Sequence, residues 1–217
     1  PKLKWIKSDI EDKIYLISFF VISLILSILI IRNLDINFLY NTILITAAFY
    51  LFFITLRDFF HRKYRNLSQI TAHFSFSILI LSILFNNIFS SEVITNLKIN
   101  ETYQAQNLKI NFESIEQENK QNFKAIKGKF IVEDQSGLIE VMQPELRIYN
   151  QPNIVTSEAD IKTNIFTDKF MTMNYVQNQD YFNIRYQVKP FMIWIWISTI
   201  LLCLSGCLSL IRKKYEN

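Results

Sequence analysis

The sequence has few of the residues that build disulfide-rich, metal-binding or phosphate-binding proteins. Among 217 residues there are 2 Cys, 2 His, 3 Gly and 4 Pro. Both cysteines, Cys203 and Cys207, lie in one apolar run near the C-terminus, so a disulfide framework elsewhere in the chain is excluded. Residues 92–189 contain no His, no Cys and no glycine-rich loop, and they show no catalytic constellation.

Charged residues are absent from four long stretches. These stretches are 18, 21, 26 and 22 residues long and cover residues 14–31, 36–56, 66–91 and 190–211. A helix needs about 20 apolar residues to cross a bilayer, and a soluble domain of this length would show periodic apolar patterns in place of unbroken runs. The sequence therefore predicts an α-helical membrane protein with four spanning helices.

The net charge of +4 sits on alternate connections between these runs. Residues 1–13 carry +1, residues 57–65 carry +3 and residues 212–217 carry +2, whereas residues 92–189 carry −2. By the positive-inside rule we expect both termini on the cytoplasmic or matrix side of a bacterial or mitochondrial inner membrane. Residues 92–189 are then periplasmic or in the intermembrane space. The basic segments predict contact with membrane lipids and do not indicate a nucleic-acid partner.

The segment between the third and fourth runs reads as an all-β extracytoplasmic domain. We divide the chain into three parts. Residues 1–91 contain a juxtamembrane lead-in, with Trp5 at the membrane interface, and three helices. Residues 92–189 form the β-rich domain, and residues 190–217 contain the last helix and a basic tail. Short alternating patterns predict six to eight strands, among them residues 97–100, 108–115, 123–133, 145–149, 170–176 and 181–188. Candidate inward positions are Phe123, Ala125, Phe130 and Val132 in one strand, and Phe182, Ile184, Tyr186 and Val188 in the last. This pattern suits a small sandwich or barrel.

A histidine lies inside the third apolar run, which is an unusual place for an ionisable side chain. The side chains of Asn66, Gln69, His73 and Ser77 form a polar stripe on one side of the predicted helix. Two interpretations of His73 remain open, a helix–helix hydrogen bond and axial ligation of a haem buried among the helices. No other histidine lies in a run, so a second axial imidazole would come from outside these residues. The other histidine, His61, belongs to a basic loop that we interpret as a solvated interface segment.

Several short motifs follow one another along the chain. They are Pro1-Lys-Leu-Lys-Trp5, Ala72-His73, residues 122–130 (NFKAIKGKF), residues 144–149 (PELRIY), residues 156–161 (TSEADI) and residues 186–196 (YQVKPFMIWIW). In this order they resemble the C-terminal part of the cytochrome c maturation protein F (CcmF) family, the membrane haem lyase subunit.

The resemblance implies a cofactor and a set of partners. Family members bind a b-type haem between two transmembrane histidines, and His73 matches one of them. Gln69 and Ser77 flank His73 at helical spacing and are predicted as the residues that orient its ring. The tryptophan-rich WWD segment of the family and its two external histidines are not in this sequence. We therefore expect the chain to be a fragment or a natural half, and not a self-sufficient enzyme. Its expected partners are the N-terminal half of the haem lyase, the haem chaperone CcmE, apocytochrome c and the subunit that presents the apocytochrome thiols.

The function that the resemblance implies is covalent attachment of haem to apocytochrome c through thioether bonds. The chain would seat a haem b on His73 and support that reaction, with no catalytic residue of its own. The alternative is a non-catalytic, membrane-anchored scaffold, whose β-domain docks the haem chaperone or apocytochrome.

Overall fold

The structure is a computed structural model that describes residues 10–32, 34, 37–60, 67–105, 108–134 and 137–216. Side chains are described within residues 14–211. Trp5, His61 and Asn66 of the sequence predictions lie outside the described residues. The chain divides into two compact units, one of residues Pro1–Ile88 with Met192–Asn217 and one of residues Phe89–Phe191.

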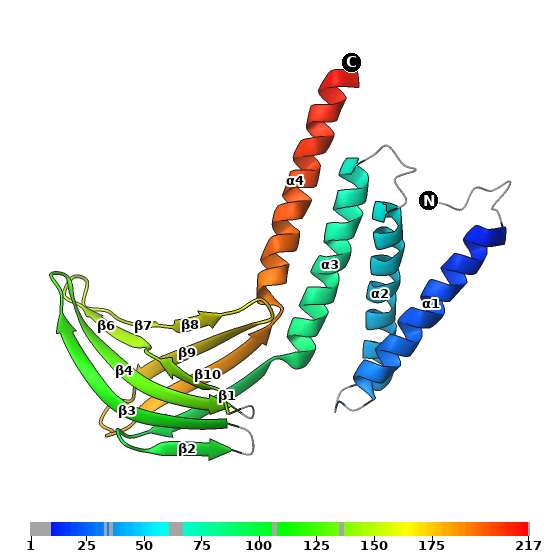
Figure 1. The fold of residues 1–217 in the computed structure, drawn as a ribbon. Coiled ribbons are helices and arrows are strands. Elements are labelled where there is room, and N and C mark those ends of the chain that lie inside the picture. The colour runs from blue at the N-terminus through cyan, green and yellow to red at the C-terminus, as the bar shows by residue number, and fades with distance from the viewer. Residues whose placement is uncertain are drawn as a thin grey trace. The chain divides into compact units, whose positions relative to one another are not determined.

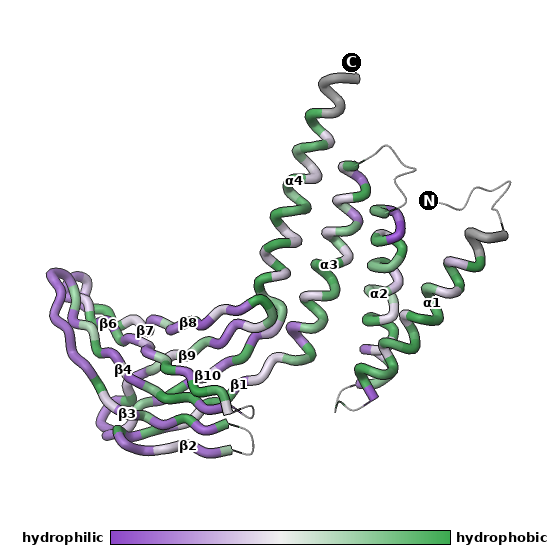
Figure 2. Tube along the Cα trace, viewed as in Figure 1, coloured by the Kyte–Doolittle hydropathy of each residue, from purple (hydrophilic) through white to green (hydrophobic). Residues whose placement is uncertain are grey.

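The first unit contains four helices that are long and apolar enough to cross a membrane, among the residues described. They are α1 (Ile10–Ile31), α2 (Phe38–Phe60), α3 (Leu67–Phe89) and α4 (Met192–Glu216) (Figure 1). Most of each helix is hydrophobic, whereas hydrophobic and hydrophilic positions alternate along the strands (Figure 2). The predicted fold class is confirmed, and the protein is a multi-pass membrane protein with a β-domain inserted before its last helix.

Small residues and aromatic rings make the contacts between the helices. Ser23 and Ser27 of α1 are fully buried, as expected where two backbones approach closely in a membrane. The Phe19 ring of α1 stacks on Phe53 of α2 with centroids 6.1 Å apart. Both hydroxyls bond back to a carbonyl one turn earlier, Ser23 Oγ to Phe19 O at 2.6 Å and Ser27 Oγ to Ser23 O at 2.7 Å, so both of these buried donors are satisfied.

The second unit is a two-sheet β-sandwich. Its strands are β1 (Ser91–Leu97), β2 (Thr102–Ala105), β3 (Leu108–Asn119), β4 (Phe123–Asp134), β5 (Ile139–Met142), β6 (Glu145–Tyr149), β7 (Val155–Glu158), β8 (Asp160–Thr163), β9 (Thr167–Tyr175) and β10 (Phe182–Pro190). One sheet has the order β1-β10-β9-β8, and the other has β2-β3-β4-β6-β7, with β5 pairing with β4. All the pairings are antiparallel, and β1 and β10, which the chain enters from α3 and leaves towards α4, are neighbours (Figure 1).

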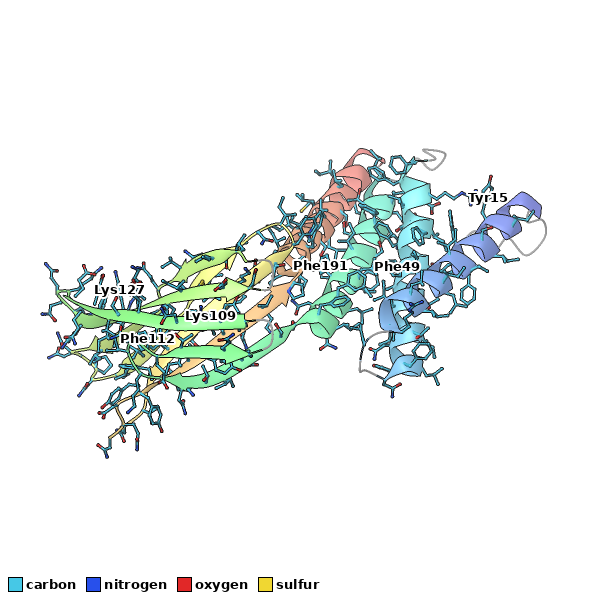
Figure 3. All side chains as sticks on the ribbon, turned by 60° about the horizontal axis from the view of Figure 1, so that its bottom comes forward. Tyr15, Phe49, Lys109, Phe112, Lys127 and Phe191 are labelled. Atoms are coloured by element: carbon cyan, nitrogen blue, oxygen red, sulfur yellow. The ribbon has the colours of Figure 1, made fainter. Side chains whose placement is uncertain are left out.

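The two sheets meet on a dry core with Phe112 and Phe130 at its centre. Their rings stack with centroids 4.3 Å apart, and both side chains are fully buried. Figure 3 shows Phe112 within the sandwich. Met171 and Met173 of β9 pack on the same cluster, as do Ile184 and the other inward residues of β10. The inward positions predicted for residues 182, 184, 186 and 188 are therefore confirmed.

Two details of the predicted strands are wrong. The strand predicted at residues 97–100 ends instead at Leu97, because residues 98–101 form a turn with Asn100 in the left-handed region at φ 66°. Phe130 and Val132 join the core cluster as predicted, and Ala125 is fully buried as predicted, although it lies outside that cluster. Phe123 is only partly buried and lies outside the cluster, so its predicted inward position is wrong.

Candidate functional site

His73 lies on an open face of α3. Its side chain is exposed, and so is that of Gln69 one turn earlier. Phe76 and Ile83, which are 47% and 49% exposed, continue this face along the helix. The open face of α3, defined by these four residues, therefore offers an imidazole and an amide within an apolar surround.

Contacts with the neighbouring helices hold the other sides of α3. Phe74 stacks on Phe52 of α2 with ring centroids 5.9 Å apart. Ser68 Oγ donates a hydrogen bond to the Ser205 backbone oxygen of α4 at 2.7 Å. These contacts fix the rotation of α3 about its axis, so His73 cannot turn towards α2 or α4 without breaking them.

Ser77 is turned away from the open face. Its Oγ lies 3.2 Å from Thr55 Oγ1 of α2 and donates to the Phe74 backbone oxygen at 2.7 Å, and the side chain is fully buried. Four residues advance a helix by about 40° beyond a full turn, which moves Ser77 from the side of His73 towards α2. The structure thus brings Gln69 and His73 together on one face and places Ser77 at the α2 contact.

The residues of the open face fit one side of a haem. The His73 ring makes no hydrogen bond to another residue within the described ranges, so a ring nitrogen is available to bind iron. An apolar surround such as Phe76 and Ile83 suits a porphyrin, whose edge is largely hydrocarbon. Among the described residues there is no group of three or more His, Cys, Asp or Glu that could hold a metal ion.

Comparison with known proteins identifies the β-sandwich. The family model described as "CcmF C-terminal beta-sandwich" matches residues 88–190. These residues are similar to the C-terminal β-sandwich of the CcmF family. The resemblance seen in the sequence is thereby confirmed, and the match begins and ends within three residues of the sandwich unit.

The CcmF relatives are longer than this chain. "Cytochrome c-type biogenesis protein ccl1" of Rhodobacter capsulatus is 29% identical over 120 residues, which are 55% of this chain and 18% of the relative. CcmF of Haemophilus influenzae is 24% identical over 167 residues, 75% of this chain and 26% of the relative. CcmF of Escherichia coli is 22% identical over 149 residues, 69% of this chain and 23% of the relative. The chain thus aligns with about a fifth to a quarter of each relative's length.

A solved structure of CcmF shares the fold. The structure named "Cytochrome c Heme Lyase CcmF" superimposes with a TM-score of 0.68 over 94% of this chain and 35% of that protein, at 13% sequence identity. The likeness covers the helices as well as the sandwich, so four helices with an inserted sandwich form the fold of that part of CcmF.

The CcmF-type sandwich contains a group of charges that the sequence did not reveal. Lys169 on β9 is only 13% exposed and pairs with Glu140 at 2.8 Å and with Asp134 at 3.5 Å. Burial, with the nearby Glu140 and Asp134 carboxylates, raises the pKa of Tyr186 to about 12. The alternation of the strand could have indicated this, because Lys169 lies two and four residues before the core residues Met171 and Met173 and therefore on the same face of β9. The charges of Lys169, Glu140 and Asp134 stabilise one another within the sandwich, and this group contains no nucleophile paired with a base.

Proposed function

We propose that the chain forms the C-terminal section of a membrane haem lyase that matures c-type cytochromes. The observation that carries the proposal is an unengaged imidazole, His73, on an open helix face in a chain of the CcmF fold. The relatives named above supply the role in cytochrome c-type biogenesis. In this proposal His73 is one axial ligand of a haem b, and a histidine outside these residues is the other.

Each residue near His73 then has a distinct task. The ring of a ligating histidine is normally oriented by a hydrogen bond from its second nitrogen. Gln69 lies one turn away on the same face and is the residue we assign to that bond. Ser77 would act through its contact with Thr55, which fixes the rotation of α3 and hence the direction of the His73 ring. A haem supplies redox chemistry when bound, and these residues hold and orient its ligand.

The orientation of the chain follows from its charges. Both termini would face the cytoplasm or matrix, and the sandwich would face the periplasm or intermembrane space, where the haem chaperone CcmE, apocytochrome c and its thiol-presenting subunit would meet it. The N-terminal half of the haem lyase would cover the open face of α3.

The decisive experiment is a haem spectrum of the purified assembly. His73→Ala should abolish the bis-imidazole b-type spectrum, and added imidazole should restore part of it, because a free ligand can occupy the space of the missing ring. Phe38→Ala, which removes a similarly exposed aromatic side chain from α2, is the matched control and should retain the haem. Gln69→Ala should retain haem with a shifted reduction potential, and an unchanged potential would remove Gln69 from the proposal.

A second candidate function is a scaffold without haem of its own. The observation in its favour is that the family model covers the sandwich and not the helices before it. In a scaffold the sandwich docks the haem chaperone or apocytochrome, and the helices only anchor it. An unchanged haem spectrum in His73→Ala would favour this candidate over the haem seat.

A further inference from the structure

The turn between β8 and β9 presents two large apolar side chains. Ile165 is 61% exposed and Phe166 is 62% exposed. The turn itself is well formed, since Asn164 Oδ1 accepts hydrogen bonds from the backbone N–H groups of Phe166 and Thr167, both at 2.8 Å. The Asn164 N–H also donates to the Thr167 oxygen at 3.0 Å. An ordered turn therefore holds both apolar side chains outward.

A hydrogen bond fixes this turn to the start of a spanning helix. The Phe191 N–H donates to the Phe166 oxygen at 2.7 Å, and Phe191 is the residue immediately before α4 (Figure 3). Whatever angle α4 makes with the sheet, this bond keeps Phe166 within one residue of the first turn of the helix. The apolar span Met192–Ile211 has 20 residues. At 1.5 Å per residue it is about 30 Å long, the thickness of the hydrocarbon core, so Met192 lies at the edge of that core.

The strand register independently places the turn beyond the first residue of β1. Ser91, the last residue of the third uncharged run, pairs with Val188, which in turn pairs with Lys169. Phe166 lies three residues beyond Lys169 at the end of the sheet where the chain enters β1 and leaves β10, about 10 Å further along the strand direction. The β8–β9 turn thus projects past the level at which β1 begins.

We propose that the β8–β9 turn is a membrane anchor, whose Ile165 and Phe166 side chains insert at the boundary between headgroups and acyl chains. An exposed aromatic and an aliphatic side chain at this depth are the residues that favour such insertion. The anchor would give the sandwich a second attachment beside the β10–α4 connection. Phe191 has a left-handed backbone at φ 60°, so the chain turns sharply there, and the inserted turn would restrict rotation about that point.

A spin label reports the depth of this turn directly. The full chain would carry Cys203→Ala and Cys207→Ala, so that a nitroxide can be attached at Phe166→Cys, and would be placed in phosphatidylcholine nanodiscs. Oxygen concentrates in the bilayer, and a neutral nickel chelate stays in water, so the ratio of their collision rates with the label measures depth. We expect a several-fold higher ratio at residue 166 than at a control site in water.

Ile154 provides the matched control. It is an apolar side chain, 50% exposed, in the turn before β7. Its backbone oxygen accepts from the Tyr149 N–H at 2.9 Å, and Tyr149 pairs with Phe123 at the first residue of β4. The other end of β4, Asp134, lies 3.5 Å from Lys169. Ile154 is thus separated from the β8–β9 turn by nearly the whole length of β4, about 35 Å.

Each outcome decides the proposal. A label at residue 166 that collides mainly with oxygen, while a label at residue 154 collides mainly with the nickel chelate, supports the anchor. Equal water accessibility at both sites would overturn it. Low collision rates with both reagents at residue 166 would also overturn it, because protein and not lipid would then cover the turn. Ile165→Cys repeats the measurement should Phe166→Cys fail to fold, and the result does not depend on haem binding.

Discussion

Gly128 occupies a position in the sandwich core that has no room for a methyl group. A Cβ added there would lie 2.5 Å from Phe130 Cε2 and 2.8 Å from Met173 Sδ. Both neighbours are fully buried and the Phe130 ring is stacked 4.3 Å from Phe112, so there is little free space into which they could move. Gly128→Ala should therefore overpack the core.

The magnitude follows from two opposing effects. Overpacking a well-packed core costs about 1–3 kcal/mol, and the reduced freedom of the unfolded chain returns about 0.5–1 kcal/mol. We expect Gly128→Ala to lower the free energy of unfolding of the sandwich by about 1–2 kcal/mol. With a urea dependence of about 1–3 kcal/mol per molar, the midpoint should fall by roughly 0.5–1 M. Pulse proteolysis of the full chain in detergent micelles, at a series of urea concentrations, measures this midpoint.

A double-mutant cycle shows whether the Phe130 ring is the cause. Phe130→Leu removes the ring atoms that the new methyl would meet, so Gly128→Ala should cost less in that background. Gly137→Ala is the control, because nothing lies within 4 Å of its Cβ but its φ is +74°. Its cost arises from the backbone and should be the same in both backgrounds. A Gly128→Ala variant as stable as the parent chain, or equally destabilised in both backgrounds, would refute the packing explanation.

Two charged features of the sandwich lead to further predictions. Burial raises the pKa of Tyr186 to about 12 from an ordinary 10, so the folded state retains the phenolic proton where the unfolded state loses it. Stability should therefore fall as the pH rises from 10 to 12, by at most about 2–3 kcal/mol, and the urea midpoint of Tyr186→Phe should fall less over the same range. Lys169→Met leaves Glu140 and Asp134 facing each other without their cation, and should lower the urea midpoint by an amount equivalent to about 1–3 kcal/mol. If Glu140→Gln in the same chain restores none of this loss, carboxylate repulsion is not its cause.

The sequence predicted the four spans and β10 correctly, because a single physical requirement dominates each of these elements. The four spans followed from the cost of charge in hydrocarbon, and β10 followed from the alternation of one buried and one solvated face. In β4 the predicted inward positions Ala125, Phe130 and Val132 are buried, and only Phe123 is not. The outward Phe123 is covered by the Arg147 guanidinium, 5.1 Å from its ring centroid. The four-residue strands β5, β7 and β8 are defined by pairing with their neighbours, and such short strands carry little pattern of their own.

The candidate site was predicted in part for a similar reason. Helical periodicity correctly placed Gln69 on the same face as His73. It could not determine which side of α3 would meet α2, since Ser77 serves equally well as a partner for a ligand or for another helix. The Thr55 hydroxyl, 22 positions earlier in the chain, resolves this choice, and no local pattern connects the two residues.

The contacts that hold α3 bear on what must cover its open face. Ser68, Phe74 and Ser77 anchor the helix to α4 and α2, so the chain cannot hide Gln69 and His73 by rotating α3. Left towards lipid, an amide and an imidazole would lack hydrogen-bond partners, and each such group in hydrocarbon is costly. The helix contacts oppose such a rotation, so we expect a ligand or another set of helices to supply these hydrogen-bond partners. The Gln69 and His73 side chains therefore predict a partner for the open face of α3. The haem spectrum of His73→Ala tests whether that partner is iron.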